Sequence, residues 1–236
     1  MLPSFLKALP IPTALLRLLA EVAVAERERR GAGFEYVRNW PDRLDGFEDL
    51  TFLFTSTILA HGVASLRLDE AAFLHRLVRE MQPETVVEIG RFRGGSTVII
   101  AAALERGALH SYDIDTRQER DGAELDRQLT GVLERYGLTD RVRLHVADSK
   151  SAVPPPGPID ILFVDGDHSE EGVRADFEHW SPQLRPGGHL LFHDAVAAPD
   201  FVSPSVSGPA RVADSIGDDF ERQAGAGSIA HFVRRV

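Results

Sequence analysis

Polar or glycine-rich groups follow five short apolar runs of this chain, and each group contains residues that could bind a ligand or transfer a proton. In chain order they are Glu88-Ile89-Gly90-Arg91-Phe92-Arg93-Gly94-Gly95-Ser96-Thr97, Asp113-Ile114-Asp115, Ala147-Asp148-Ser149, Asp165-Gly166-Asp167-His168 and His193-Asp194. Any one of them could be a surface turn, but five in succession indicate a site assembled from several loops.

The first group is a glycine-rich loop. Its glycines allow a tight turn and a close approach of the backbone to a ligand, and Ser96 is expected to cap the following helix. A dinucleotide fingerprint needs glycine at its first, third and sixth places, but Phe92 occupies the middle place and would crowd a pyrophosphate. No Gly-Lys-Ser/Thr follows, so the loop is not a P-loop either.

Asp113 is a candidate for binding a ribose. It follows Gly90 by 23 residues, close to the spacing of about 20 at which a strand-end acid binds ribose hydroxyls. A carboxylate can accept hydrogen bonds from both hydroxyls of a diol.

Alternating strands and helices must position these loops. We expect strands at 85–89, 109–114, 142–146, 159–164 and 189–192, helices at 96–105, 118–136 and 171–180, and a turn at 186–188. Ser169 is expected to cap the last of these helices, and Gly137 to end the one before it. Such alternation predicts a parallel sheet covered on both faces, with ligands at the carboxyl ends of its strands.

Both ends of the chain add to this centre. Residues 220–223 and 228–234 are expected to form a β-hairpin through the glycine-containing segment 224–227. Residues 1–65 are expected to be a helical extension that serves as a lid or a dimer contact, and residues 66–236 the main domain. In the extension, residues 13–30 have apolar residues at helical spacing and charges of both signs, which argues against a membrane helix and allows a homodimer. Asp69 is expected to cap a helix over 69–81.

Composition excludes several classes of protein. The chain has 236 residues, a net charge of −10 and no cysteine. Nonspecific nucleic-acid binding is therefore not expected, and neither disulfides nor thiolate metal sites can form. No run of 18 apolar residues occurs, so we expect no membrane span and a cytoplasmic location.

Taken together, these groups resemble the class I S-adenosylmethionine-dependent methyltransferases. The resemblance is to the small-molecule O-methyltransferase branch, and within it to the family grouped with macrolide-sugar O-methyltransferases and cephalosporin-hydroxylase-like proteins. It covers about residues 66–236 and is carried by segments 87–96, 113–115, 163–168 and 184–194. It implies an α/β, Rossmann-like, doubly wound seven-stranded sheet, mostly parallel, with a C-terminal β-hairpin, joined here to an N-terminal helical extension.

The resemblance also implies how S-adenosylmethionine is bound. The methionine part would lie by the glycine loop, the ribose on Asp113 and the adenine near Asp148 and Ser149, with Glu88 supporting the loop from below. The full set of implied cofactor residues is Glu88, Gly90, Phe92, Gly94, Ser96, Asp113, Asp148, Ser149 and Asp165.

Two histidines stand where the catechol-type members of the family have other residues. His168 occupies the place of a catalytic lysine, where a neutral imidazole could serve as a general base with a pKa near 6.5, although it could also merely cap a helix. Asp165 occupies the place of a metal-binding aspartate, but His193-Asp194 replaces the family's Asp-Asn or Asp-Asp. Asp165, His193 and Asp194 are thus candidate ligands of a divalent metal, and suit a transition metal better than Mg²⁺. Alternatively, His193 packs at its strand end and Asp194 orients the substrate.

The function implied is transfer of a methyl group from S-adenosylmethionine to a hydroxyl of a small molecule, with Asp165 and His168 as catalytic residues. A nucleic-acid methyltransferase is disfavoured by the charge and by the lack of an Asn/Asp-Pro-Pro-aromatic block. The remaining alternative is a non-catalytic S-adenosylmethionine-binding module that regulates or binds a partner.

Overall fold

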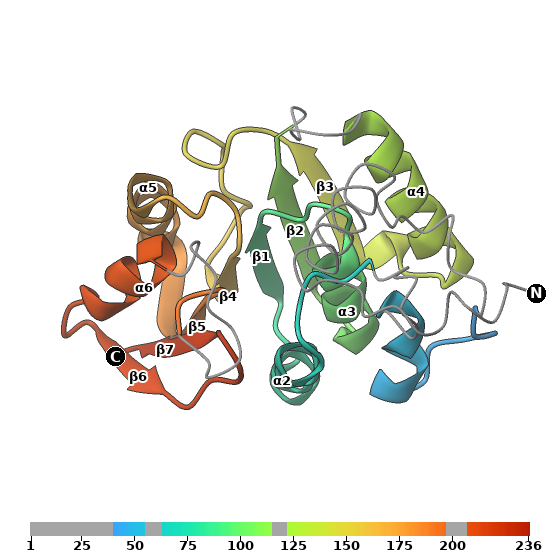
Figure 1. Ribbon diagram of the computed structural model, residues 1–236, viewed down its shortest axis with the longest axis horizontal. Coiled ribbons are helices and arrows are strands. Elements are labelled where there is room, and N and C mark those ends of the chain that lie inside the picture. Colours follow the sequence, from blue (N-terminus) through green and yellow to red (C-terminus); the bar gives the residue numbers. More distant parts are fainter. Residues whose placement is uncertain (1–39, 55–62, 115–121, 197–206) are drawn as a thin grey trace, which may run out of the picture.

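The computed structural model describes residues 40–54, 63–114, 122–196 and 207–236, and contains one seven-stranded sheet in the order β3-β2-β1-β4-β5-β7-β6 (Figure 1). The strands are β1 (Thr85–Ile89), β2 (Ala108–Asp113), β3 (Val142–Val146), β4 (Ile159–Val164), β5 (Leu184–Phe192), β6 (Phe220–Gln223) and β7 (Ala230–Arg234). Strands β1 to β5 pair in parallel, whereas β7 pairs antiparallel with both β5 and β6. The predicted sheet and its C-terminal hairpin are therefore confirmed.

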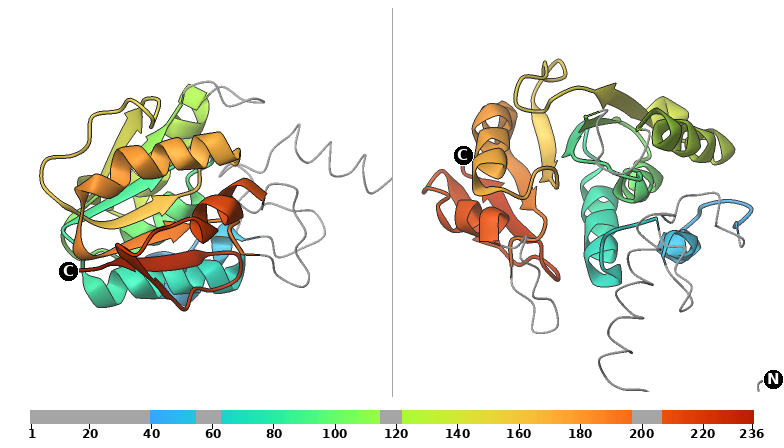
Figure 2. Two further views of the ribbon diagram at one scale, coloured as in Figure 1. Left: turned by 90° about the vertical axis from the view of Figure 1, so that its left-hand side faces the viewer. Right: turned by 45° about the horizontal axis from the view of Figure 1, so that its top comes forward.

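Helices cover both faces of the sheet. They are α2 (Leu68–Met81), α3 (Gly95–Ala103), α4 (Gly122–Arg135), α5 (Glu170–Trp180) and α6 (Ser207–Asp214), with short 3-10 helices η3 (Phe47–Leu53), η4 (Thr139–Arg141) and η5 (Ser181–Gln183). Helices α2, α3 and α4 pack into one core and α5 and α6 into the other, and Figure 2 shows the sheet between α2 and α5. In β1, Val86 belongs to the first core and Val87 to the second, as the alternation of side chains along a strand requires.

Several local predictions are confirmed at the level of single hydrogen bonds or angles. Ser169 caps α5, because its hydroxyl accepts a 3.0 Å hydrogen bond from the amide of Gly172. Gly137 follows α4 with a φ of 63°, a left-handed conformation that glycine adopts without strain. Every residue of β4 is buried, in agreement with its mostly apolar sequence, which only Asp160 interrupts.

Three local predictions were wrong. Helix α2 begins one residue earlier than expected, so its N-cap is Arg67 and not Asp69. Helix α3 is preceded by Gly94 in a left-handed conformation (φ 84°), which places Ser96 inside the helix and not at its cap. The turn expected at 186–188 lies within β5 as a bulge, because Ile159 pairs with Leu184 while Ile161 pairs with His189.

The N-terminal extension is described only in part. Residues 40–54 include η3, whose Leu50, Phe52 and Leu53 are buried in the same core as α2 and α3. The helix predicted over 13–30, and with it the argument for a homodimer, lies outside the described residues. Within the part of the chain that the structure describes, no helix is long and apolar enough to span a membrane.

Candidate functional site

The glycine-rich loop between β1 and α3 lies against the end of β4. Gly90 has a φ of 83°, and a Cβ atom there would come within 2.3 Å of the backbone oxygen of Asp165. No other residue fits this place without moving the backbone. Gly90 therefore brings the proposed cofactor loop into direct contact with the first residue of the proposed catalytic group.

Asp113 holds this loop from the end of β2. Its Oδ2 accepts hydrogen bonds from the amides of Arg91 (2.9 Å) and Phe92 (2.7 Å). The Arg91 side chain is buried and fixes the loop from the other side, through an ion pair with Asp126 (2.6 Å) and a hydrogen bond to the carbonyl of Ser111. This role of Arg91 was not predicted from the sequence, since arginine in a loop usually faces solvent.

Phe92 lies on the outer surface of the loop, whereas Gly94 is buried. Phe92 has a left-handed backbone (φ 47°) and its residue is 46% exposed. Such a conformation costs a non-glycine residue about 1–3 kcal/mol and tends to occur at functional sites. The structure thus exposes Phe92, whose backbone amide bonds Asp113, where the sequence predicted a cofactor contact.

The residues predicted to lie near adenine follow β3 at the same edge of the sheet. Asp148 is exposed, and its Oδ1 accepts a hydrogen bond from the amide of Lys150. The hydroxyl of Ser149 donates to Oδ1 of the buried Asp176 on α5 (2.6 Å). Asp176 was not identified from the sequence, because its position in α5 looks like that of any helical acid.

Glu88 lies beneath the loop, as predicted, and is completely buried. Its Oε2 accepts hydrogen bonds from the hydroxyls of Thr97 (2.7 Å) and Ser111 (2.5 Å). These hydroxyls and that of Ser96 each lower the pKa of Glu88. Oε1 has no hydrogen-bond partner among the described residues. Burial raises the pKa of Glu88 because the charged form loses its hydration, and the hydroxyls offset only part of this.

A carboxyl whose pKa is raised on folding binds its proton more tightly in the folded state, so it destabilises the protein as the pH rises through the folded-state pKa. The Glu88→Gln variant cannot ionise, and we expect its melting temperature to fall less between pH 5 and pH 8 than that of the wild type. Each 1 kcal/mol of destabilisation that the substitution removes should raise Tm by about 2–4 °C at the upper pH. Differential scanning fluorimetry with the exposed Glu84→Gln as control would measure this, and equal pH slopes for wild type and Glu88→Gln would contradict it.

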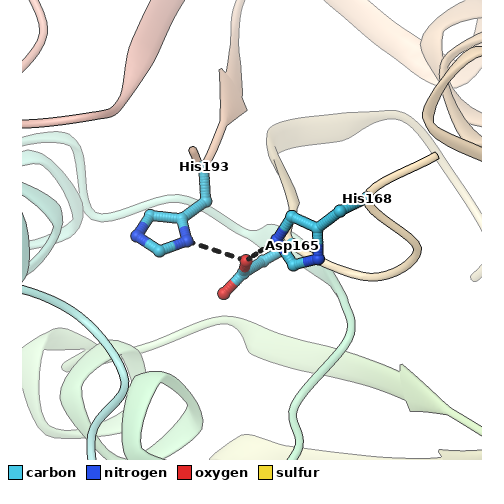
Figure 3. Close-up of side chains that lie close together, drawn as sticks. All are labelled: Asp165, His168 and His193. Carbon is cyan, nitrogen blue, oxygen red and sulfur yellow. Dashed lines mark hydrogen bonds and ion pairs between the residues drawn. The ribbon is translucent and has the colours of Figure 1, made fainter. Parts of the chain in front are cut away.

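Four predicted residues meet at the ends of β4 and β5. His193 Nδ1 lies 2.8 Å from Oδ1 of Asp165, and His168 Nε2 lies 3.6 Å from the same oxygen (Figure 3). His168 Nε2 is also 3.3 Å from Oδ2 of Asp194, which in turn is 3.8 Å from His193 Nδ1. Two carboxylates and two imidazoles thus alternate around a small polar cluster, as the sequence predicted.

The carboxylates hold His168 in its charged form. Contacts with Asp165 and Asp194 raise the pKa of His168 to about 9, against a smaller opposing effect of burial. The ring nitrogen Nε2 is itself buried and makes no well-aligned hydrogen bond among the described residues. Only a small fraction of the His168 rings is therefore neutral at pH 7.

Two further residues of the cluster come from distant parts of the chain. Glu70, in the first turn of α2, is 1% exposed, and its Oε2 lies 3.1 Å from His193 Nε2. Ser228, before β7, donates its hydroxyl to Asp194 Oδ1 (3.3 Å) and its amide to Glu70 Oε1 (2.7 Å). Sequence reasoning missed both, because they are far in sequence from the residues they contact.

The metal implied by the resemblance can be tested against these donors. Asp165, His168 and His193 each offer one atom, and these atoms lie within 4.8 Å of one another. However, two of the three are imidazole nitrogens, whereas Mg²⁺ prefers oxygen ligands in an octahedral arrangement. The nitrogen of His193 that faces the set already bonds Asp165, and its other nitrogen bonds Glu70. The residues therefore do not fit a Mg²⁺ site.

Comparisons with known proteins agree with this fold. A family described as "Methyltransferase domain" matches residues 87–195, the segment that runs from the glycine loop to the residue after Asp194. The protein y4gI of Sinorhizobium fredii is 30% identical over 125 residues, but the match spans 50% of this chain and only 14% of that protein. Catechol O-methyltransferase of Niastella koreensis is 26% identical over 172 residues, covering 69% of this chain and 73% of that one.

Solved structures share the fold. The O-methyltransferase TomG of Streptomyces achromogenes, in complex with S-adenosylmethionine, superimposes with a TM-score of 0.58 at 19% identity, over 92% of this chain and 96% of that one. The fold and the loop at its carboxyl edge define a Rossmann-like methyltransferase. Residues 87–195 belong to this methyltransferase-domain family, and the resemblance to the class I S-adenosylmethionine-dependent methyltransferases inferred from the sequence is confirmed.

Proposed function

We propose that this chain transfers the methyl group of S-adenosylmethionine to a hydroxyl oxygen of a small molecule. One observation carries the proposal: Nε2 of His168 lies between Asp165 and Asp194, and the backbone of Asp165 packs closely against Gly90 of the loop that the family uses for the cofactor. The relative from Niastella koreensis is named a catechol O-methyltransferase, which supports an oxygen acceptor. The net charge of −10 favours a small acceptor over a nucleic acid.

The residues at the carboxyl edge suit the cofactor. The glycines of the loop allow its backbone to approach a ligand, Asp113 stands at a strand end suited to a ribose, and Asp148 lies exposed beyond β3. When bound, S-adenosylmethionine supplies a methyl group on a positively charged sulfur. We assign its binding to Glu88, Gly90, Phe92, Gly94, Ser96, Asp113, Asp148, Ser149 and Asp165.

His168 is assigned the role of general base. In its neutral form Nε2 takes the proton of the acceptor hydroxyl while that oxygen bonds the methyl carbon, and the carbon–sulfur bond breaks with its electron pair left on sulfur. Asp165 and Asp194 stabilise the resulting imidazolium, since each has an oxygen within 3.6 Å of Nε2. The rest of the rate comes from alignment of the two substrates.

Two measurements test this proposal. Isothermal titration with S-adenosylhomocysteine should show saturable binding, and a panel of phenols, catechols and sugars should be assayed with methyl-labelled S-adenosylmethionine. Label should appear on oxygen in at least one product, and S-adenosylhomocysteine should form in equal amount. Binding without turnover on any acceptor would instead favour the non-catalytic module.

A further inference from the structure

The four residues at the ends of β4 and β5 belong to a closed ring of polar contacts. From Glu70 it runs to His193 (3.1 Å), Asp165 (2.8 Å), His168 (3.6 Å), Asp194 (3.3 Å), Ser228 (3.3 Å) and back to Glu70 (2.7 Å). Except for the partly exposed His168, the residues of the ring are buried or nearly so. The ring contains the carboxylates of Glu70, Asp165 and Asp194 and the imidazoles of His168 and His193.

Glu70 is built into this ring and not merely near it. Its Oε2 also accepts the amide of Arg67 (2.8 Å), which fixes the side chain against the start of α2. Gly227 permits its approach, because a Cβ at that residue would lie 2.5 Å from Glu70 Oε1. A buried carboxylate costs several kcal/mol unless it is paired, so the native fold keeps Glu70 here because Arg67, His193 and Ser228 all bond it.

His193 stands where the resemblance places a metal-binding carboxylate. Its two ring nitrogens each face a carboxylate oxygen, Nδ1 toward Asp165 and Nε2 toward Glu70. A ring that donates from both nitrogens is an imidazolium and has no lone pair for a metal.

We infer that the Glu70–His193 pair occupies the place of the divalent metal in this chain, and that Glu70 is a positioning residue that holds His193 and, through it, Asp165. The positive charge next to Asp165 is then part of the protein and does not have to be acquired from solution. This inference rests on the proposed function only for the effect on turnover, because ion binding can be measured without an acceptor.

Metal binding tests the first half of the inference. Protein dialysed against chelator should contain no stoichiometric Mg, Mn or Zn by plasma mass spectrometry. Isothermal titration with Mg²⁺, Mn²⁺ or Zn²⁺ should show no saturable binding, and chelator should leave methyl transfer unchanged.

The His193→Asp variant restores the carboxylate that the resemblance expects, and it should gain saturable Mg²⁺ binding. Stoichiometric binding of any of these ions by the wild type would overturn the inference. Failure of His193→Asp to bind Mg²⁺ would overturn the claim that His193 takes the place of the ion.

Kinetics of Glu70→Gln test the second half. The amide keeps the length of the side chain but removes its charge, so the ring of His193 should be held less firmly. We expect kcat to fall by about 10–100-fold, the scale of a small misplacement of a reacting group. The KM for S-adenosylmethionine and the affinity for S-adenosylhomocysteine should remain unchanged. A merely structural role would instead lower the melting temperature and alter cofactor affinity together.

Glu80→Gln, on the exposed side of the same helix, is the matched control and should behave as wild type. An unchanged kcat in folded Glu70→Gln would overturn the positioning role. If Glu70→Gln does not fold, the metal titrations of wild type and His193→Asp still decide the inference. If no acceptor is found and the proposed function fails, the same titrations decide it as well.

Discussion

Replacing His168 with alanine is expected to lower kcat for methyl transfer by roughly 10²–10⁴-fold, the usual range for loss of a general base. Affinity for S-adenosylhomocysteine should stay near that of the wild type, because His168 lies at the ends of β4 and β5 and not in the glycine loop. Product formation measured at saturating concentrations of both substrates would give this result directly.

The pH dependence of the wild type is the sharper form of this prediction. With the pKa of His168 raised to about 9 by its two carboxylate neighbours, the neutral base is the minor form at pH 7. The rate should therefore rise about tenfold per pH unit from pH 7 toward 9 and level off above it. From the sequence, this rise in rate was predicted near pH 6.5, the pKa of an isolated imidazole. Sequence alone could not show that two carboxylates flank the ring.

His179→Ala is a suitable control, since its ring contacts the carbonyl of Ala152 and not the cluster. This variant should retain the wild-type rate and the wild-type rise in rate between pH 7 and 9. Full activity in His168→Ala, or a pH limb that persists in that variant, would exclude His168 as the base and leave alignment of the substrates as the main source of rate.

The fold could be predicted from the sequence because its signals are local. β-branched apolar runs such as those of β1 and β4 have few alternatives to a buried parallel strand. The strand ends then located most of the site, since parallel strands bring their carboxyl ends to one edge. Asp165, His168, His193 and Asp194 were predicted in this way, without any direct sign that their side chains touch.

What could not be predicted depends on contacts between distant segments. The first turn of α2 contains two acids, Asp69 and Glu70, and the sequence does not show which one faces inward. Glu70 lies on the same helical face as the buried Leu74 and Val78, so the packing of α2 directs it toward His193, 123 residues away. Arg91 was missed for a similar reason, because its partner Asp126 lies on α4.

The second large effect is expected in cofactor binding. The Asp113→Ala variant removes a carboxylate that accepts hydrogen bonds from the amides of Arg91 and Phe92 and that is assigned to the ribose. Loss of a hydrogen bond to a charged group costs about 1.5–3 kcal/mol. We therefore expect the Kd for S-adenosylhomocysteine to rise by about 10–150-fold, since each 1.4 kcal/mol is a factor of ten.

Asp113→Asn separates the two roles of this side chain. An asparagine oxygen can still accept from the loop amides, while its NH₂ group replaces the second carboxylate oxygen. If Asp113 acts only by holding the loop, Asn should restore most of the affinity, whereas a direct contact with the ribose diol should leave it weakened. Isothermal titration would measure both variants beside Asp140→Ala, an exposed control at the other end of the sheet. Unchanged affinity in Asp113→Ala would reject the assignment of Asp113 to the cofactor, because a strand-end carboxylate bonded to ribose cannot be removed without weakening the complex.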